Sequence, residues 1–376
     1  MKKLIIFAAV FLLLASASSL SVTAQEEEIF KEQYQNSGAD ELYDMLTDDA
    51  KSLMDELGAS PESYDWQKVL QPKNVFEIIG DLIRNGAKAP FSAFGVMVVM
   101  LVAASVVNGI FSEKSNQVSG VMTYISLICG TLCTVVPFVK LIEGVITALK
   151  GCSNFVLGFI PIYIGVLTSM GKPATAAASS SVMLCVCQAV TQLAGNFILP
   201  VISVYLALNI TSVSGGMFKT ARLGETLKTV SIWSLSFLMT VFLGIMGIQT
   251  TIGGAADTAG MRTAKFVVSS TVPIVGVAVS EAISTVAGSL KLLSTTTGMF
   301  AVLSVVLIFL PVLCQLLMWK LAVLLLCGFA RLLDERDVES VTAAINSTIS
   351  MIIGITLCIG IMFVVSLAII ISVGGR

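Results

Sequence analysis

Residues 297–329 read TGMFAVLSVVLIFLPVLCQLLMWKLAVLLLCGF, and this stretch contains a single charged residue, Lys320. A run of about 18 or more apolar residues with few charges is typical of a membrane-spanning helix. Other long apolar runs begin at Pro90 and Val118 and recur as far as the last residues. The chain of 376 residues is 56% hydrophobic and 12% charged, whereas a soluble domain carries about 25% charged residues. The sequence therefore predicts an all-α, polytopic membrane protein.

Two apolar stretches, 141–250 and 252–362, share landmarks in the same order. Leu199-Pro200-Val201 recurs as Leu310-Pro311-Val312, and Phe218 recurs as Phe329, both 111 positions later. We interpret the stretches as two tandem membrane repeats with Pro-broken helices, an arrangement that often encloses a site between the copies. The alternative is that Pro and Phe recur by chance in a long hydrophobic chain. Short proline-containing pieces either cross the membrane or re-enter it, so parallel and inverted copies both stay open, with roughly seven to ten crossings.

The first 24 residues have the features of a cleavable signal peptide. Two lysines precede an apolar core over residues 4–14, and small residues, Val22 and Ala24, stand before Gln25. We expect cleavage between Ala24 and Gln25. The alternative is an uncleaved signal anchor.

The next region, 25–88, is acidic. It carries fifteen acidic and six basic side chains, whereas 89–376 carries nine acidic and fourteen basic ones. Apolar residues between Leu42 and Leu57 recur at helical spacing, and Gly58 is suited to end that helix. We expect a small helical extracytoplasmic region here. A transmembrane hairpin over 89–139 and membrane repeats over 140–250 and 251–376 are expected to follow.

Polar side chains within the apolar runs are candidates for function, because an ionisable group inside a membrane is costly. Lys320 lies in the middle of such a run, and its counterpart in the first repeat is Asn209. Small residues at every fourth position beside Glu281 are expected to let helices pack closely, and a hinge or pore-lining face is the alternative. We expect Glu281 to pair with Lys320. The candidate polar positions are Lys320, Glu281, Asn209, Gln188 and Gln315, and the small-residue stripe is Gly276, Ser280, Ser284 and Gly288.

Catalytic signatures are missing from the sequence. The chain has no histidine, and its eight cysteines lie in or beside apolar segments, where they are expected to be small buried hydrophobic residues. It contains no P-loop, no dinucleotide-binding glycine pattern and no cluster with metal-ligand spacing. We therefore predict no catalytic residue, no cofactor and no metal site, and we expect a protein that is not an enzyme.

Three segments carry a resemblance to a known family. They read DELYDMLT over 40–47, PKNVFEII over 72–79 and LDERDVESVTAAIN over 333–346. Together with the signal peptide and the polytopic region, they resemble stage III sporulation protein AE of endospore-forming bacteria.

This resemblance implies a subunit of a secretion-like channel complex that links mother cell and forespore. The chain would lie in the mother-cell membrane around the forespore, with its acidic region between the two membranes. An ATPase and ring-forming proteins would be its partners, and nucleic acid would not. The alternative is a stand-alone secondary transporter with a midplane site between the repeats.

Overall fold

The computed structural model describes residues 24–60, 69, 71–111, 116–213, 220–271, 276–333 and 335–375. Within these ranges the chain is helical and has no strand. The expected signal peptide lies outside the described residues except for Ala24, which begins the first helix. The elements are α2 (Ala24–Ser37), the 3-10 turn η1 (Ala39–Leu42), α3 (Asp48–Glu56), α5 (Pro72–Phe111), α6 (Asn116–Ser169), α7 (Pro173–Leu193), the π-helical η2 (Ala194–Ile198), α8 (Leu199–Val213), α9 (Thr220–Thr271), α10 (Gly276–Leu332) and α11 (Arg336–Gly375).

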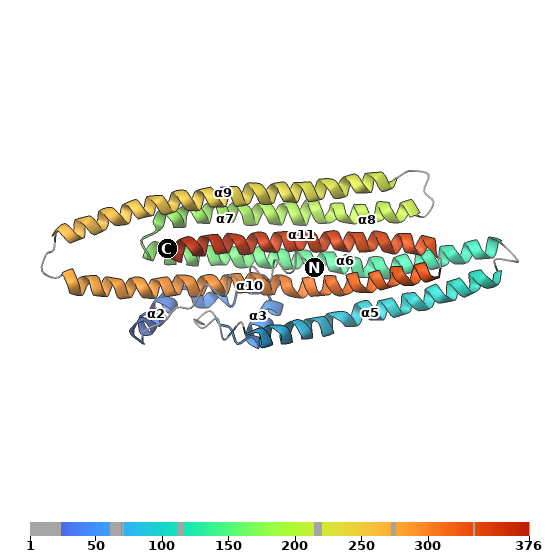
Figure 1. The fold of residues 1–376 in the computed structure, drawn as a ribbon, viewed down its shortest axis with the longest axis horizontal. Helices are drawn as coiled ribbons and strands as arrows, with labels where there is room; N and C mark the ends of the chain where they lie inside the picture. The colour runs from blue at the N-terminus through green and yellow to red at the C-terminus, as the bar shows by residue number, and fades with distance from the viewer. Residues whose placement is uncertain are drawn as a thin grey trace.

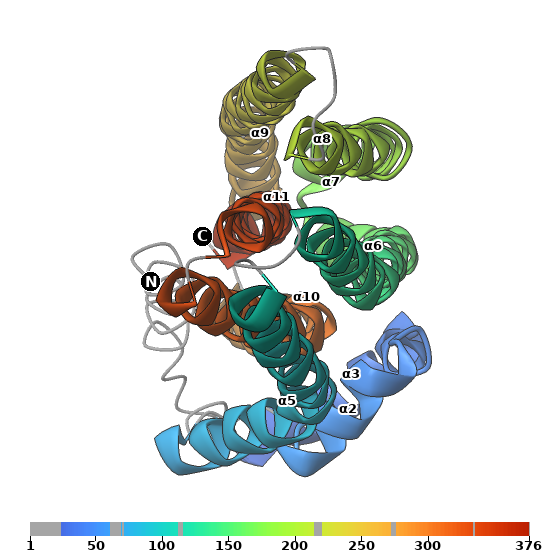
Figure 2. The same ribbon diagram turned by 90° about the vertical axis from the view of Figure 1, so that its right-hand side faces the viewer.

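The long helices lie side by side with their axes nearly parallel, and α7, η2 and α8 together form one rod (Figure 1). Seen end-on, α9 lies on one side of the bundle and α2 and α3 lie on the opposite side, with α11 between them (Figure 2). The 57 residues of α10 extend about 85 Å at 1.5 Å per residue. The hydrocarbon core of a bilayer is only about 30 Å thick, so part of this helix lies outside it.

The core is centred on α10 and α11, which pack against each other along most of their length. Phe300, Phe309 and Phe363 are among the largest fully buried side chains. Gly298 permits the close approach, because a Cβ at this position would lie 2.5 Å from Cγ1 of Ile371 on α11. Phe155 joins α6 to this core, with its ring centroid 6.5 Å from that of Phe300.

The all-α, membrane-type fold is thus confirmed, but prolines do not break the helices as expected. Pro161 lies inside α6 and Pro311 inside α10. Only the first Leu-Pro-Val sequence is preceded by an irregularity, the π-helical η2. Helix α10 also runs unbroken through the positions that correspond to the α6–α7 turn, where Gly171 has φ +75°. The two copies therefore differ in secondary structure here, and the duplication remains a hypothesis.

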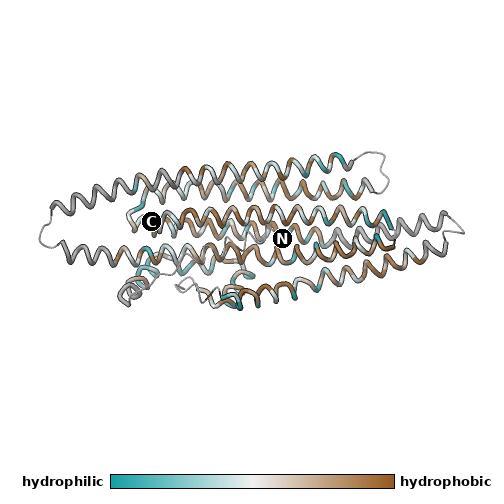
Figure 3. Tube along the Cα trace, in the orientation of Figure 1, coloured by the Kyte–Doolittle hydropathy of each residue, from teal (hydrophilic) through white to brown (hydrophobic). Residues whose placement is uncertain are grey.

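Five segments of the described residues are long and apolar enough to cross a membrane, and the roughly seven to ten crossings expected for the whole chain remain a prediction. The five segments are Pro72–Ala103, Pro137–Ser169, Pro173–Thr211, Val286–Leu332 and Val338–Ser372. Figure 3 shows the apolar residues spread along the rods rather than confined to short blocks. The second half of the expected hairpin and the start of the first expected repeat lie on one continuous helix, α6.

The acidic N-terminal helices are packed onto the bundle. Buried residues of α2, η1 and α3, among them Phe30, Leu42 and Met54, belong to the same hydrophobic cluster as the cores of α6 and α10. Gly58 has φ +63°, so it ends α3 in the left-handed conformation, as its position predicted. The expected division at 88/89 falls inside the continuous helix α5.

Candidate functional site

A polar cluster that joins three separate parts of the chain lies at the start of α7. This helix begins after the turn at Gly171, with Pro173 in its first turn and no side-chain cap from Lys172. Its free N–H groups are bound from another helix: one carboxylate oxygen of Asp257 on α9 accepts from Ala174 at 2.9 Å, and the other accepts from Thr175 at 2.8 Å. Asp257 is 8% exposed. The carboxylate satisfies orphan donors and complements the positive end of the helix dipole.

Two lysines lie in the electrostatic surroundings of this cap. Burial lowers the pKa of Lys172 from its usual value of 10.5, and the positive charge of Lys291 on α10 lowers it further. The Asp257 carboxylate raises the pKa of Lys172 in opposition to these two effects. The hydroxyl of Thr175 is fully buried and has no hydrogen-bond partner. Charged side chains from α9, from the α6–α7 turn and from α10 thus interact electrostatically at this end of α7.

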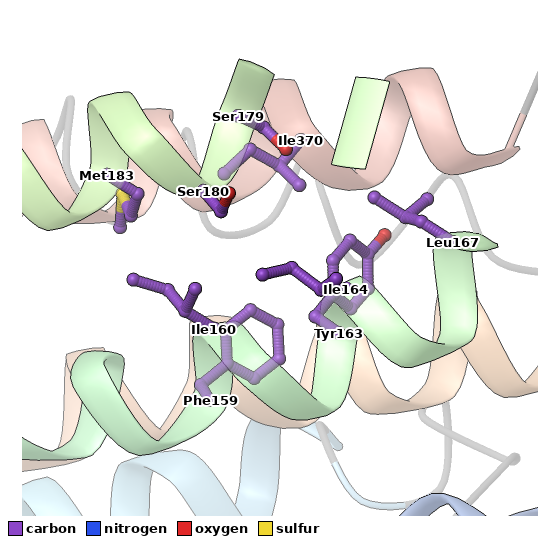
Figure 4. Close-up of a pocket in the computed structure, with 9 residues that line it drawn as sticks. All are labelled: Phe159, Ile160, Tyr163, Ile164, Leu167, Ser179, Ser180, Met183 and Ile370. Atoms are coloured by element: carbon purple, nitrogen blue, oxygen red, sulfur yellow. The ribbon is translucent and has the colours of Figure 1, made fainter. Parts of the chain in front are cut away.

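A small cavity lies nearby between α6 and α7 (Figure 4). Its volume is 10 Å³, about enough for one water molecule. Tyr163 lines it, and its hydroxyl oxygen lies 3.0 Å from that of Ser294 on α10. Ser179 and Ser180 also line it, but their hydroxyls donate to backbone carbonyls of their own helix. The remaining lining residues are Phe159, Ile160, Ile164, Leu167, Met183 and Ile370, so this cavity is not suited to a polar ligand.

The structure separates the residues that the sequence singled out. Lys320 and Asn209 are half-buried, and the Asn209 side chain donates to the Tyr205 carbonyl oxygen at 2.7 Å. Gln188 on α7 and Gln315 on α10 are exposed. The described side chains among these candidates therefore lie in separate surroundings on different helices and do not form one site.

The expected ion pair between Lys320 and Glu281 is wrong within one chain. Both residues lie on the unbroken helix α10. Their separation of 39 positions corresponds to about 58 Å along the axis. The pairing was expected because both residues lie deep in the same apolar repeat, but one continuous helix keeps them far apart.

The small-residue stripe, Gly276, Ser280, Ser284 and Gly288, lies at the start of α10. Gly288 is half-buried, and the side-chain surroundings of the other three lie outside the described residues. Close packing along this stripe remains a prediction.

Sequence reasoning missed Asp257, Lys172 and Lys291. One signal was present: Asp257 is the only acidic residue between Glu225 and Glu281. Pro173 also marks a helix start, which needs an acceptor for its free N–H groups. Nothing in the sequence joins these two observations, because the residues are more than 80 positions apart.

Metal binding has no support in the described ranges, where no three His, Cys, Asp or Glu side chains are grouped to hold an ion. Cys152, Cys187, Cys314 and Cys327 are buried free thiols, as expected for small hydrophobic residues, whereas Cys185 is exposed. The arrangement around Asp257 holds helices together. It presents no nucleophile beside a base.

The fold defines the class of this chain as an all-α, multi-pass membrane protein. Its described polar cluster caps the start of helix α7. The family described as Stage III sporulation protein AE matches residues 61–374. The chain belongs to this family, which confirms the resemblance seen in the sequence. It is also similar to Stage III sporulation protein AE of Bacillus subtilis (strain 168), with 27% identity over 231 residues. That alignment covers 60% of this chain and 57% of the relative. No solved structure matches the chain.

Proposed function

We propose that this chain is a non-enzymatic, integral membrane subunit of the sporulation channel complex that links mother cell and forespore. Family membership over residues 61–374 supports a role in sporulation. The helical bundle with five candidate spans supports a place in the membrane. The cell membrane concerned is the mother-cell membrane that surrounds the forespore.

One structural observation favours a subunit of a larger assembly: two outer helices leave apolar faces uncovered. On α5 the exposed residues include Phe76, Val96, Val99 and Val106, and on α9 they include Leu223, Trp233 and Phe237. Single exposed apolar residues are ordinary, but contiguous apolar surfaces mark contacts with lipid or with other proteins. The acidic N-terminal region is expected to face the space between the two membranes.

The proposed partners include an ATPase, because the sequence of this chain offers no means of using ATP itself. Its sequence has no nucleotide-binding motif, so energy for any export step would come from a separate ATPase. Ring-forming membrane proteins would supply the rest of the conduit.

Co-purification tests this proposal. The tagged full-length chain is isolated in mild detergent from sporulating cells and from vegetative cells that express it. A channel subunit is expected to bring an ATPase and ring-forming proteins from the sporulating cells only. If the chain purifies alone from sporulating cells, and drives solute uptake when reconstituted in vesicles, it is a stand-alone secondary transporter and the proposal is wrong.

A test of the non-enzymatic role uses single substitutions. Lys320→Gln, Asn209→Ala and Gln315→Ala are each expected to leave a folded, inserted chain with sporulation near the parental level. A large loss of sporulation, with normal insertion and normal partner binding, would instead indicate that one polar group performs chemistry or conducts an ion.

A further inference from the structure

Helices α9 and α10 contain charge-free intervals of equal length. On α9, Lys228 and Asp257 enclose residues 229–256, and on α10, Lys291 and Lys320 enclose residues 292–319. Each interval has 28 residues, which extend about 42 Å on a helix. A bilayer with its headgroup regions is about 40–45 Å thick. The intervals therefore have the length of one complete membrane crossing.

The ends of the two intervals lie at matching levels. Helices α9 and α10 run in opposite directions along the bundle (Figure 1), so the Asp257 end of one interval lies near the Lys291 end of the other. The Asp257 carboxylate accepts from the amides of Ala174 and Thr175, two and three residues after Lys172, and the charge of Lys291 also reaches Lys172, so these three charges lie close to one level. Because the intervals are equally long, Lys228 and Lys320 share a second layer about 42 Å away. A bilayer with its two surfaces at these layers would enclose both charge-free intervals.

The outer face of α9 between these layers is apolar. Its exposed residues recur at helical spacing and are Val230, Trp233, Phe237, Val241, Ile245 and Ile248, of which Val241 and Ile245 also line a largely apolar hollow between α9 and α7. They extend over about 27 Å, and the rings of Trp233 and Phe237 stack with their centroids 5.6 Å apart. Such a stripe suits lipid hydrocarbon, with the aromatic pair toward the Lys228 end, where a membrane interface is expected.

Helices α2 and α3 lie on the side of the bundle opposite α9 (Figure 2), and α3 lies below the middle part of α10 in Figure 1. A Cβ on Gly151 of α6 would lie 2.5 Å from the Thr47 methyl carbon and 4.0 Å from Cγ2 of Ile308. Ile308 is 17 positions after Lys291 and 12 before Lys320. Thr47 thus contacts the bundle near the middle of the charge-free layer, and Asp48 and Asp49 follow it directly.

The outward surface of these helices is strongly negative. Its exposed acidic residues are Glu32, Asp40, Glu41, Asp44, Asp48, Asp49, Asp55 and Glu56. Lys51 offers one positive charge nearby, 4.0 Å from Asp44. Ionised carboxylates are strongly disfavoured in hydrocarbon and, at membrane depth, face the protein interior or a water-filled cavity. This surface is therefore unsuited to contact with lipid.

We infer that α9 faces lipid, whereas the surface of η1 and α3 lines a water-filled space at bilayer depth that opens into the space between the two membranes. This inference rests on the proposed function, because other subunits of the complex must separate that space from lipid. The acidic wall would concentrate cations and positively charged segments and repel anions. The chain would then form one side of a conduit selective for positive charge.

The test places single cysteines in the full-length chain within membranes of sporulating cells, in a background without native cysteines that still sporulates. Asp48→Cys and Ser52→Cys probe the acidic surface, and Val241→Cys and Ile245→Cys are matched positions on α9 at similar depth. We expect a small water-soluble thiol reagent to modify positions 48 and 52 and to leave 241 and 245 unmodified. A cationic reagent is expected to modify position 52 about 10-fold faster than an anionic reagent of the same size.

A second measurement needs no cysteine replacement. Phospholipids with a nitroxide at mid-chain are expected to quench the fluorescence of a tryptophan placed by Val241→Trp, but not of one placed by Ser52→Trp, each compared with the parental chain. Quenching at position 52, or its failure to react in water, would show that the acidic surface does not line an aqueous space. Aqueous labelling at 241 and 245 would show that the charge-free interval lies outside the bilayer. Neither outcome depends on whether partners co-purify, so failure of this inference is separable from failure of the proposed function.

Discussion

The contact between the N-terminal region and α6 depends on two glycines, whose missing side chains leave room for residues of that region. At Gly151 the space of a Cβ is taken by the Thr47 methyl carbon, 2.5 Å away, and at Gly158 it is taken by Met45. Thr47 has a short, branched side chain next to the first turn of α3, so its methyl group has little freedom to move. We therefore predict that Gly151→Ala weakens docking of the N-terminal helices on the bundle.

The expected size of the effect follows from overpacking. Extra methyl groups in a packed interface cost about 1–3 kcal/mol. Helix propensity does not enter, because α6 is helical whether or not the N-terminal helices are docked. The undocked fraction should therefore increase by roughly 5- to 150-fold.

Proteolysis of the purified, detergent-solubilised mature chain measures that fraction. When opening and closing are fast, the cleavage rate follows the population of the open form. Trypsin cleavage after Lys51 should be faster in Gly151→Ala by the factor above. Gly165→Ala on the same helix is the matched control, since a Cβ there meets nothing within 4 Å.

A compensating variant makes the reasoning refutable. Thr47→Ser removes the offending methyl group and keeps the hydroxyl, so Gly151→Ala combined with Thr47→Ser should return the cleavage rate close to the parental value. The steric account is refuted if Gly151→Ala is cleaved no faster than Gly165→Ala, or if Thr47→Ser gives no recovery.

Three further predictions concern charge and pH. Asp257→Asn removes the charge and one acceptor from the α7 cap, so we expect a loss of about 1–2 kcal/mol, seen as faster hydrogen exchange of the Ala174 amide; unchanged exchange would contradict the capping role. The same substitution removes the charge that raises the pKa of Lys172, so that pKa should fall further and amine acylation below pH 10.5 should become faster, as measured by mass spectrometry. Tyr43 donates to the Asp55 carboxylate at 2.5 Å, which raises the pKa of Tyr43 above 10.0, so this contact stabilises the fold below that pH and is lost as pH rises through the raised value. Phenolate absorbance at high pH should shift to lower pH in Asp55→Asn, and an unchanged titration would contradict the contact.

The helix ends show where sequence reasoning succeeded. The end of α3 at Gly58 was predictable because a left-handed residue there favours glycine whatever surrounds it. The expectation of breaks at the prolines was wrong because a proline is tolerated inside a helix where its surroundings compensate for the lost hydrogen bond, and Pro161 and Pro311 lie within the continuous helices α6 and α10. The pairing of Glu281 with Lys320 was wrong because a shared place in one apolar repeat does not fix the distance between two residues on a helix of 57 residues.

The polar cluster at α7 shows where sequence reasoning could not succeed. Asp257 and Thr175 are 82 positions apart, and each occurs in a segment of small residues without a motif. Their contact exists because α9 lies beside α7 in the folded bundle. Only the packing of these two helices determines which acid reaches the free amides.

The sequence by itself determined the class of this protein. Apolar content, the rarity of charge and the diffuse family segments sufficed for an all-α membrane protein of a sporulation family, because burial of apolar surface and helix formation in lipid depend on composition and local pattern. Only the tertiary structure decided which charged residues lie at the same height along the bundle axis and which helix faces are exposed. Those properties arise from the packing of the helices against one another, to which Gly151 and Gly158 contribute by admitting Thr47 and Met45 onto α6, and Gly298 by admitting Ile371 onto α10.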